Sequence, residues 1–270
     1  MSIFPIDWPM LLVCLGVSIA SGLVVFHVVA GYYHIRYYVL RRDDAANWKC
    51  QPDRWLRPEQ QREAALLSTF NLTLGGTISG ILIYCIAKGM PTPIYLEVSE
   101  YGWPYTIASG ILLFVLNDGA AYYVHRTLHR KKLFKSIHRY HHRYIATSPY
   151  VTTAVHPVEL LLLQGASFLP LFFIPVHAGA IGVVLVYILV MNIVDHSGVR
   201  LHSSLPWQGP SLFHDDHHKH FHCNFGQHLM IWDRMHGTLR RVKRRYGKDV
   251  FGGRGEAENG AAEQDAFVKY

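Results

Sequence analysis

The chain contains 270 residues, half of them apolar, and carries a formal net charge of +7. This length and composition fit either one large domain or a small protein that crosses a membrane several times. A net positive charge could indicate a nucleic-acid-binding protein, but the distribution of the lysines and arginines along the chain argues against nucleic acid as a partner.

Five apolar runs organise the chain, at residues 8–30, 64–87, 104–124, 158–174 and 178–193. Each run is close to the ~17–25 residues that a membrane-spanning helix needs. The sequence therefore predicts an all-α, multispanning membrane helix bundle. We expect four to five membrane helices or hairpins, because the last two runs are short and Pro170 and Pro175 lie near the turn between them. In the second run, the spacing of Gly76 and Gly80 predicts close packing against another helix.

The basic residues predict how the chain is oriented in the membrane. If all five runs cross, only Lys88 of the 26 lysines and arginines lies on the face that carries the N-terminus, and the other 25 share the opposite face. An excess of positive charge of this kind marks the cytoplasmic side. The first seven residues contain no basic residue, whereas Arg36, Arg41 and Arg42 follow the first run, so we expect a retained anchor with its N-terminus outside.

Three histidine motifs follow the third run and lie on the predicted cytoplasmic face. Residues three and four apart share one face of a helix, so the imidazoles of each motif are expected to project together. Eight imidazoles are more than one transition-metal ion takes and about the number that two ions need. The sequence thus predicts a cytoplasmic, histidine-rich helical cap that binds two metal ions. The motif histidines are His125 and His129, then His138, His141 and His142, and finally His214, His217 and His218.

The ligand type does not choose the metal. Imidazole suits iron, zinc, copper and nickel alike. No pair among the four cysteines has metal-ligand spacing, which argues against a zinc site made of thiolates.

Four carboxylates are placed to support these imidazoles. Asp118 precedes His125 by seven residues, or two helical turns, and is predicted to orient a ligand ring through its other nitrogen, unless it only reaches the membrane interface. Asp215 and Asp216 are expected to fix the tautomers of neighbouring rings, unless one of them only caps its helix. Glu159 lies just after Pro157, near the positive end of the helix predicted for the fourth run, and is the fourth supporting carboxylate.

These motifs resemble those of the sterol desaturase and fatty acid hydroxylase superfamily of membrane di-iron oxygenases. The resemblance covers about residues 105–240 and includes HPxE at 156–159, DHSG at 195–198, and NFGQ and WDRMHGT within 224–238. The run 148–159 and the NFGQ and WDR segments look most like the lathosterol oxidase branch. The DHSG segment also looks like the methylsterol monooxygenase branch.

The resemblance implies roles for particular histidines. The eight motif histidines would be the catalytic ligands of two iron ions, His196 would be a ninth ligand, and His156 would either bind metal or support a ligand. His220 and His222 depart from the family pattern and are expected to lie near the site or at the surface. The other histidines are expected to be structural or solvated: His27, His34, His177, His202, His228 and His236.

The resemblance also implies a reaction. O2 and electrons from cytochrome b5 or a reductase would be used to desaturate or hydroxylate a sterol-like lipid taken from the bilayer, in the endoplasmic reticulum. A fatty acyl, sphingolipid or methylsterol hydroxylase is the alternative within the superfamily. Residues 1–251 would form a single membrane oxygenase domain, and residues 252–270 are predicted to be a disordered tail because they have little to bury.

A histidine-rich metal transporter is the alternative from another functional class. A transporter is expected to place its ligands near the bilayer midplane on broken helices. The motifs here follow a helix end, and the apolar runs are nearly free of ionisable residues, which favours the enzyme.

Overall fold

The computed structural model describes residues 6–203, 205–240 and 250–251. Within them the chain is helical and contains no strand. Four helices are long and apolar enough to cross a membrane: α1 (Trp8–Tyr33), extended by the π-helical η1 (His34–Val39), then α3 (Pro58–Ala87), α4 (Gly102–Leu128) and α8 (Ala178–His196). The predicted all-α, multispanning bundle is confirmed, and the chain is a multi-pass membrane protein. The tail expected at 252–270 lies outside the described residues.

The fourth apolar run forms a shorter segment, α7 (Pro157–Phe168) followed by the 3₁₀ turn η6 (Leu169–Phe172). Its first turn lies beside the histidines, where Glu159 contacts His138. Its end lies at the opposite end of the bundle, because the Tyr95 amide donates to the Val176 carbonyl and Tyr95 belongs to the loop between α3 and α4. The chain therefore passes between the two ends of the bundle five times, and the fourth pass is the shortest.

Local chemistry sets where these helices begin. Asp7 caps α1 by accepting a hydrogen bond from the Met10 amide (3.2 Å). His156 and His177 cap α7 and α8 in the same way, because their Nδ1 atoms accept from the amides of Val158 and Gly179. These caps satisfy amides that have no partner within the helix.

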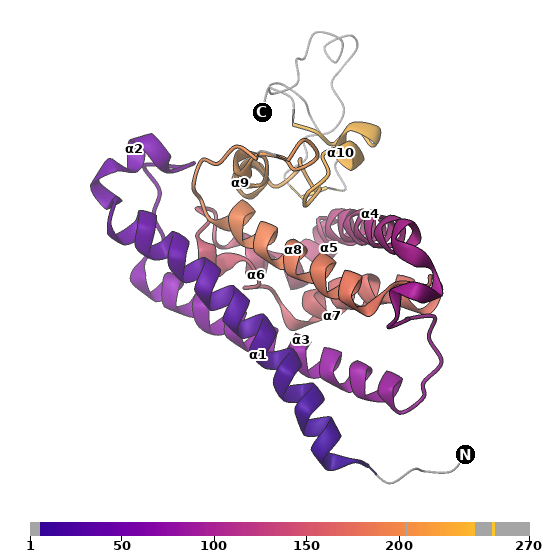
Figure 1. Cartoon of the computed structure of the whole chain (residues 1–270). Coiled ribbons are helices and arrows are strands. Elements are labelled where there is room, and N and C mark those ends of the chain that lie inside the picture. The colour runs from indigo at the N-terminus through magenta and orange to yellow at the C-terminus, as the bar shows by residue number, and fades with distance from the viewer. Residues whose placement is uncertain (1–5, 204, 241–249, 252–270) are drawn as a thin grey trace.

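Helices α1 and α3 pack antiparallel and very closely. A Cβ atom added to Gly76 or Gly80 would lie 2.8 Å from the Cα of Ile19 or Leu15, respectively. Only glycine fits at such a backbone approach. The close packing predicted from these glycines is confirmed, and Figure 1 shows the two helices running side by side.

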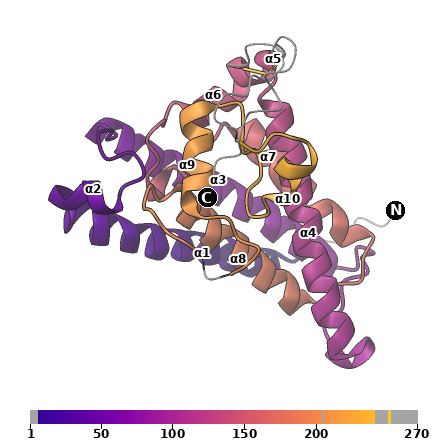
Figure 2. The same cartoon turned by 90° about the horizontal axis from the view of Figure 1, so that it is seen from above.

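Short elements join the long helices and form the cap. The short helices and helical turns before α8 are η2 (Arg42–Asp44), α2 (Ala45–Trp48), η3 (Val98–Glu100), α5 (Lys131–Leu133), the π-helical η4 (Phe134–His138), α6 (Arg139–His142) and η5 (Pro149–Val151). After α8 come α9 (Ser211–His220) and α10 (Ile231–Met235). Figure 1 shows α9 and α10 above α8 and α4, and in Figure 2, viewed from above, α10 lies beside α4.

Candidate metal centre

Nine buried histidines gather where the ends of α4 and α8 meet α6 and α9. Within each of two groups, the potential ligand atoms lie within 4.8 Å of one another. The first group is His125, His129, His138, His142 and His217, and the second is His141, His196, His214 and His218. These are the eight motif histidines and the ninth candidate.

The imidazoles of each motif were expected to project together, but the structure divides two of the motifs between the two groups. His141 and His142 belong to different groups, and so do His217 and His218. Consecutive residues on a helix point about 100° apart, so each HH pair supplies one ring to each group. Both groups therefore depend on α6 and α9 together.

The Nε2 atoms converge within each group. His142 Nε2 lies 3.2 Å from His129 Nε2 and 3.0 Å from His217 Nε2, and His125 Nε2 lies 3.0 Å from His138 Nε2. In the second group, His196 Nε2 lies 3.1 Å from His141 Nε2 and 2.9 Å from His214 Nε2.

These separations match a shared metal ion. A ring nitrogen has one in-plane bonding position, so the same Nε2 cannot make two well-directed hydrogen bonds. Ligand nitrogens about 2.0–2.1 Å from an ion lie roughly 2.9–3.4 Å apart, for angles between a right angle and a tetrahedral one. The donor set therefore fits two metal ions, one in each group.

The opposite ring nitrogens are held by the backbone. Nδ1 of His125 donates to the Phe225 carbonyl (2.8 Å), that of His217 to the Cys223 carbonyl (2.7 Å), and that of His196 to the Asn192 carbonyl (2.8 Å). A carbonyl can only accept, so these Nδ1 atoms carry the proton and each Nε2 presents its lone pair to the centre. Such contacts orient metal-binding imidazoles.

Glu159 supports a ring with its carboxylate. Its Oε1 lies 2.8 Å from His138 Nδ1, and both side chains are almost completely buried. A carboxylate behind a metal-binding imidazole fixes the ring orientation and raises its basicity. The structure thus places Glu159 where the sequence suggested a supporting carboxylate.

Burial keeps six of the clustered imidazoles outside the membrane helices neutral. Desolvation, and secondarily the neighbouring imidazoles, hold the pKa of six cluster histidines outside the membrane helices well below the usual value of 6.5: His129, His141, His142, His214, His217 and His218. Neutral imidazole is the form that binds a metal.

Asp118 has a different role from the one expected. Its carboxylate accepts hydrogen bonds from the amides of His228 (3.0 Å) and Leu229 (3.2 Å) and from Trp232 Nε1 (2.8 Å). It therefore fastens the loop after α9 to α4, because its side chain faces that returning loop. The prediction that Asp118 directly orients an imidazole is wrong, although the loop it holds includes Phe225, the partner of His125.

Asp233 fixes the same loop from within. Its carboxylate accepts from the amides of Phe225 (2.9 Å) and Gly226 (2.7 Å) and from the Thr238 hydroxyl (2.6 Å). Burial raises the pKa of Asp233 to about 6 despite these donors. The WDR segment was recognised in the sequence, but nothing local in it indicated that its aspartate holds a backbone carbonyl behind His125.

The two aspartates of α9 also have other partners. Asp215 accepts from Thr147 Oγ1 (2.9 Å) and Gln51 Nε2 (3.1 Å). Asp216 forms an ion pair with Arg240. Asp215 thus ties α9 to two distant segments rather than fixing a tautomer, because positions 214, 217 and 218 face the metal groups and 215 faces away from them. Gln51 and Thr147 were missed, since only the fold brings them to α9.

The remaining histidine candidates lie outside both groups. His156 was expected either to bind metal or to support a ligand, but it caps α7, packs edge-on against Tyr140 and lies outside both groups. His220 is partly exposed, and its Nε2 lies 3.9 Å from Asp216 Oδ1. His222 is also only partly buried.

Comparisons with known proteins agree with this arrangement. The fatty acid hydroxylase family matches residues 110–238. Delta(7)-sterol 5(6)-desaturase erg3B of Aspergillus fumigatus is 31% identical over 162 residues, which cover 60% of this chain and 45% of the relative. Lathosterol oxidase of Rattus norvegicus is 31% identical over 159 residues, covering 57% and 53%.

A third relative, Delta(7)-sterol 5(6)-desaturase erg31 of Schizosaccharomyces pombe, is 28% identical over 147 residues, covering 54% of this chain and 49% of the relative. The chain spans about half the length of the curated relatives it matches. No solved structure matches it. Residues 110–238 are therefore similar to the fatty acid hydroxylase family, and the relatives support a resemblance to the sterol desaturase branch of that superfamily.

Proposed function

We propose that the protein is a membrane-bound oxidoreductase that uses O2 and two iron ions to desaturate or hydroxylate a sterol-like lipid. The observation that carries this proposal is the pair of buried histidine groups, whose Nε2 atoms converge at metal-ligand separations. Iron bound there would supply the O2 activation needed to remove hydrogen from an unactivated carbon.

The protein's own part in this reaction is to orient, insulate and position. Backbone carbonyls and Glu159 fix the imidazole rings, and burial keeps the rings neutral and excludes water. The turn η5 packs among α1, α3 and α8. The choice between desaturation and hydroxylation then depends on which carbon the protein holds closest to the metals.

An acidic electron donor of the cytochrome b5 type fits the surface beside the metal groups. Five exposed basic residues lie on the segment that leads from α4 into α6: Arg130, Lys131, Lys132, Lys135 and Arg139. Charge complementarity of this kind speeds association and is screened by salt. Lys131→Glu with Lys132→Glu should slow reduction by cytochrome b5, most clearly at low ionic strength, and leave metal content unchanged.

We also place the histidine groups on the cytoplasmic side of the endoplasmic reticulum membrane. The excess of basic residues on the histidine side supports the orientation, and the similarity to the family supports the organelle. Protease protection of the region 130–139 in sealed microsomes would contradict this orientation.

Lipid analysis tests the reaction. Cells that express the wild-type chain, His141→Ala or the control His27→Ala are supplied with sterol and fatty acyl precursors. Their lipid extracts are then compared by mass spectrometry. His27 is an exposed histidine of α1 outside both groups. A product that lacks two hydrogens and is absent only from cells with His141→Ala indicates a desaturase. A product that gains one oxygen in the same pattern indicates a hydroxylase, whose substrate would be a sterol, methylsterol, fatty acyl or sphingolipid.

No lipid difference in either precursor class would refute the enzyme. Metal uptake that depends on His141 would then point to the transporter. The positions of the groups at the ends of α4 and α8 favour the enzyme, because a transporter is expected to bind its ion near the bilayer midplane.

A further inference from the structure

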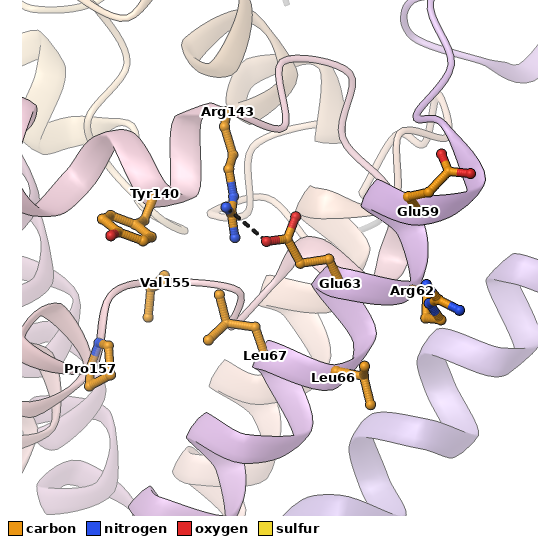
Figure 3. A pocket seen from close by; sticks show the side chains of 9 residues that line it. All are labelled: Glu59, Arg62, Glu63, Leu66, Leu67, Tyr140, Arg143, Val155 and Pro157. Carbon is orange, nitrogen blue, oxygen red and sulfur yellow. Dashed lines mark ion pairs between the residues drawn. The ribbon is translucent and has the colours of Figure 1, made fainter.

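A pocket of about 560 Å³ opens between the start of α3, the end of α6 and the start of α7. Figure 3 shows its charged rim and its apolar floor. We propose that this pocket binds the hydroxyl end of a sterol, whose apolar body extends along α3 into the membrane. This inference rests on the proposed function and names where its substrate binds. The lining residues are Glu59, Arg62, Glu63, Leu66, Leu67, Tyr140, Arg143, Val155 and Pro157.

The rim favours a neutral hydroxyl over an anionic head group. Two glutamates and two arginines line the pocket, so its formal charge is zero. Arg143 Nη1 lies 2.9 Å from Glu63 Oε1, and their side chains are 34% and 50% exposed. A hydroxyl can donate to the carboxylate and accept from the guanidinium at once, whereas a phosphate would be repelled by the glutamates.

Aromatic rings hold the guanidinium in place. The Arg143 guanidinium lies over the rings of Tyr140 and Tyr144, 5.5 and 4.9 Å from their centroids. Such contacts restrict a long side chain that is otherwise mobile. The polar end of the pocket is therefore preorganised.

An apolar ridge continues the pocket towards the membrane interior. Leu66 and Phe70 are four residues apart on α3, share one face, and are 65% and 55% exposed. Further along, Gln164 Nε2 donates to the Gly75 carbonyl (2.8 Å) and joins α7 to α3. The rise along α3 from Glu63 to Gly75 is about 18 Å. The contact between Gln164 and Gly75 marks the far end of the ridge.

Three residues that line the pocket are close in the sequence to residues of the metal centre. Tyr140 directly precedes His141, Arg143 directly follows His142, and Pro157 lies two residues before Glu159. A lipid in the pocket would therefore lie against the segments that carry both histidine groups. A second hollow, of about 500 Å³, lies along α8 between Gly179 and Val190, but the Tyr187 hydroxyl there is already bonded to Gln208 and Trp207. That hollow offers a sterol hydroxyl a poorer partner.

A photoreactive cholesterol analogue tests the site without any turnover. The full chain in phospholipid nanodiscs is irradiated with the probe, and labelled peptides are mapped by mass spectrometry. We expect labels in 59–70 and 140–157, which unlabelled cholesterol removes and ceramide does not. Labels confined to 179–190, or equal competition by ceramide, would overturn the proposal.

Two variant pairs sharpen the test. Leu66→Trp fills the pocket and should weaken probe binding roughly tenfold, the order expected when the burial of one aliphatic side chain is lost. Leu12→Trp is its control, because Leu12 is 63% exposed near the start of α1. Arg143→Leu should also weaken binding roughly tenfold, whereas Arg41→Leu breaks a comparably exposed ion pair away from the pocket and should not.

The outcomes separate this inference from the proposed function. Equal labelling of Leu66→Trp and Leu12→Trp overturns the pocket, even if the wild-type protein oxidises sterols. Specific labelling of the pocket without any sterol product supports the site and counts against the reaction. Where product forms, Leu66→Trp should raise KM for the sterol with unchanged iron content.

Discussion

Glu159 provides a quantitative test of the metal centre. Its Oε1 lies 2.8 Å from His138 Nδ1, with side-chain exposures of 3% and 1%. Glu159→Ala would leave the Nδ1 proton without an acceptor in a dry site, at a cost of about 1–3 kcal/mol. Loss of a carboxylate behind a metal-binding imidazole typically lowers metal affinity about 10- to 100-fold, or roughly 1.4–2.7 kcal/mol. The two estimates agree.

Glu159→Gln should have a smaller effect. Glutamine keeps an oxygen that can accept from Nδ1 and loses only the charge, so we expect a loss of iron affinity of about tenfold or less. Iron-loaded proteins are titrated with a competing chelator, and retained iron is measured by plasma mass spectrometry. Glu97→Ala, at an exposed glutamate between α3 and α4, is the control. Unchanged iron affinity in Glu159→Ala would refute the assigned role of the Glu159–His138 contact.

Three further predictions concern stability. Because His129, His141, His142, His214, His217 and His218 have lower pKa values in the folded chain than the unfolded value of 6.5, the unfolded chain takes up protons first as pH falls. The metal-free protein should therefore lose stability from about pH 6.5 downward, by up to about 1.4 kcal/mol per histidine and pH unit, and an unchanged Tm between pH 7.5 and 5.5 would contradict this. Gly198→Ala should lower Tm, because Gly198 has φ +70° and a Cβ there would lie 2.7 Å from the Thr147 carbonyl oxygen. The backbone alone costs about 1–2 kcal/mol, whereas Gly182→Ala, with open space around it, should not destabilise. Gly80→Ala should lower the free energy of unfolding by about 1–3 kcal/mol, because the added Cβ would force α1 and α3 apart. Gly22→Ala is the control, since a Cβ there contacts nothing, and an equal loss of stability in this variant would argue against that cause.

The membrane bundle could be predicted because hydropathy and helix length are local properties. The apolar runs identified the four long helices, but α3 begins at Pro58, six residues before the run expected from 64. The extra turns contain Glu59 and Glu63, and their polar character led to the assignment of this segment to a loop. The fourth run was identified, but it forms only a short helix and a 3₁₀ turn, since Pro170 interrupts it.

The histidines of the site could also be identified, because their spacing on helices is visible in the sequence. Their division into two groups could not, since it depends on how α6 and α9 are turned relative to each other. The same limit applies to two aspartates whose partners are distant in the sequence. Asp118 accepts from His228, 110 residues away, and Asp215 accepts from Gln51 and Thr147. Spacing shows which side chains share a face, but tertiary packing decides what that face meets.

The arrangement of the ligands has a consequence for biosynthesis. The first group needs His217 and the second needs His214 and His218, so both remain incomplete until the ribosome has translated α9. By then α1, α3, α4 and α8 have all been made, and Gln51 and Thr147 are ready to receive Asp215. A nascent chain shorter than this offers only a partial set of imidazoles to any metal it meets. Metal loading should therefore follow completion of the bundle, and chains that stop before residue 214 should leave both groups incomplete.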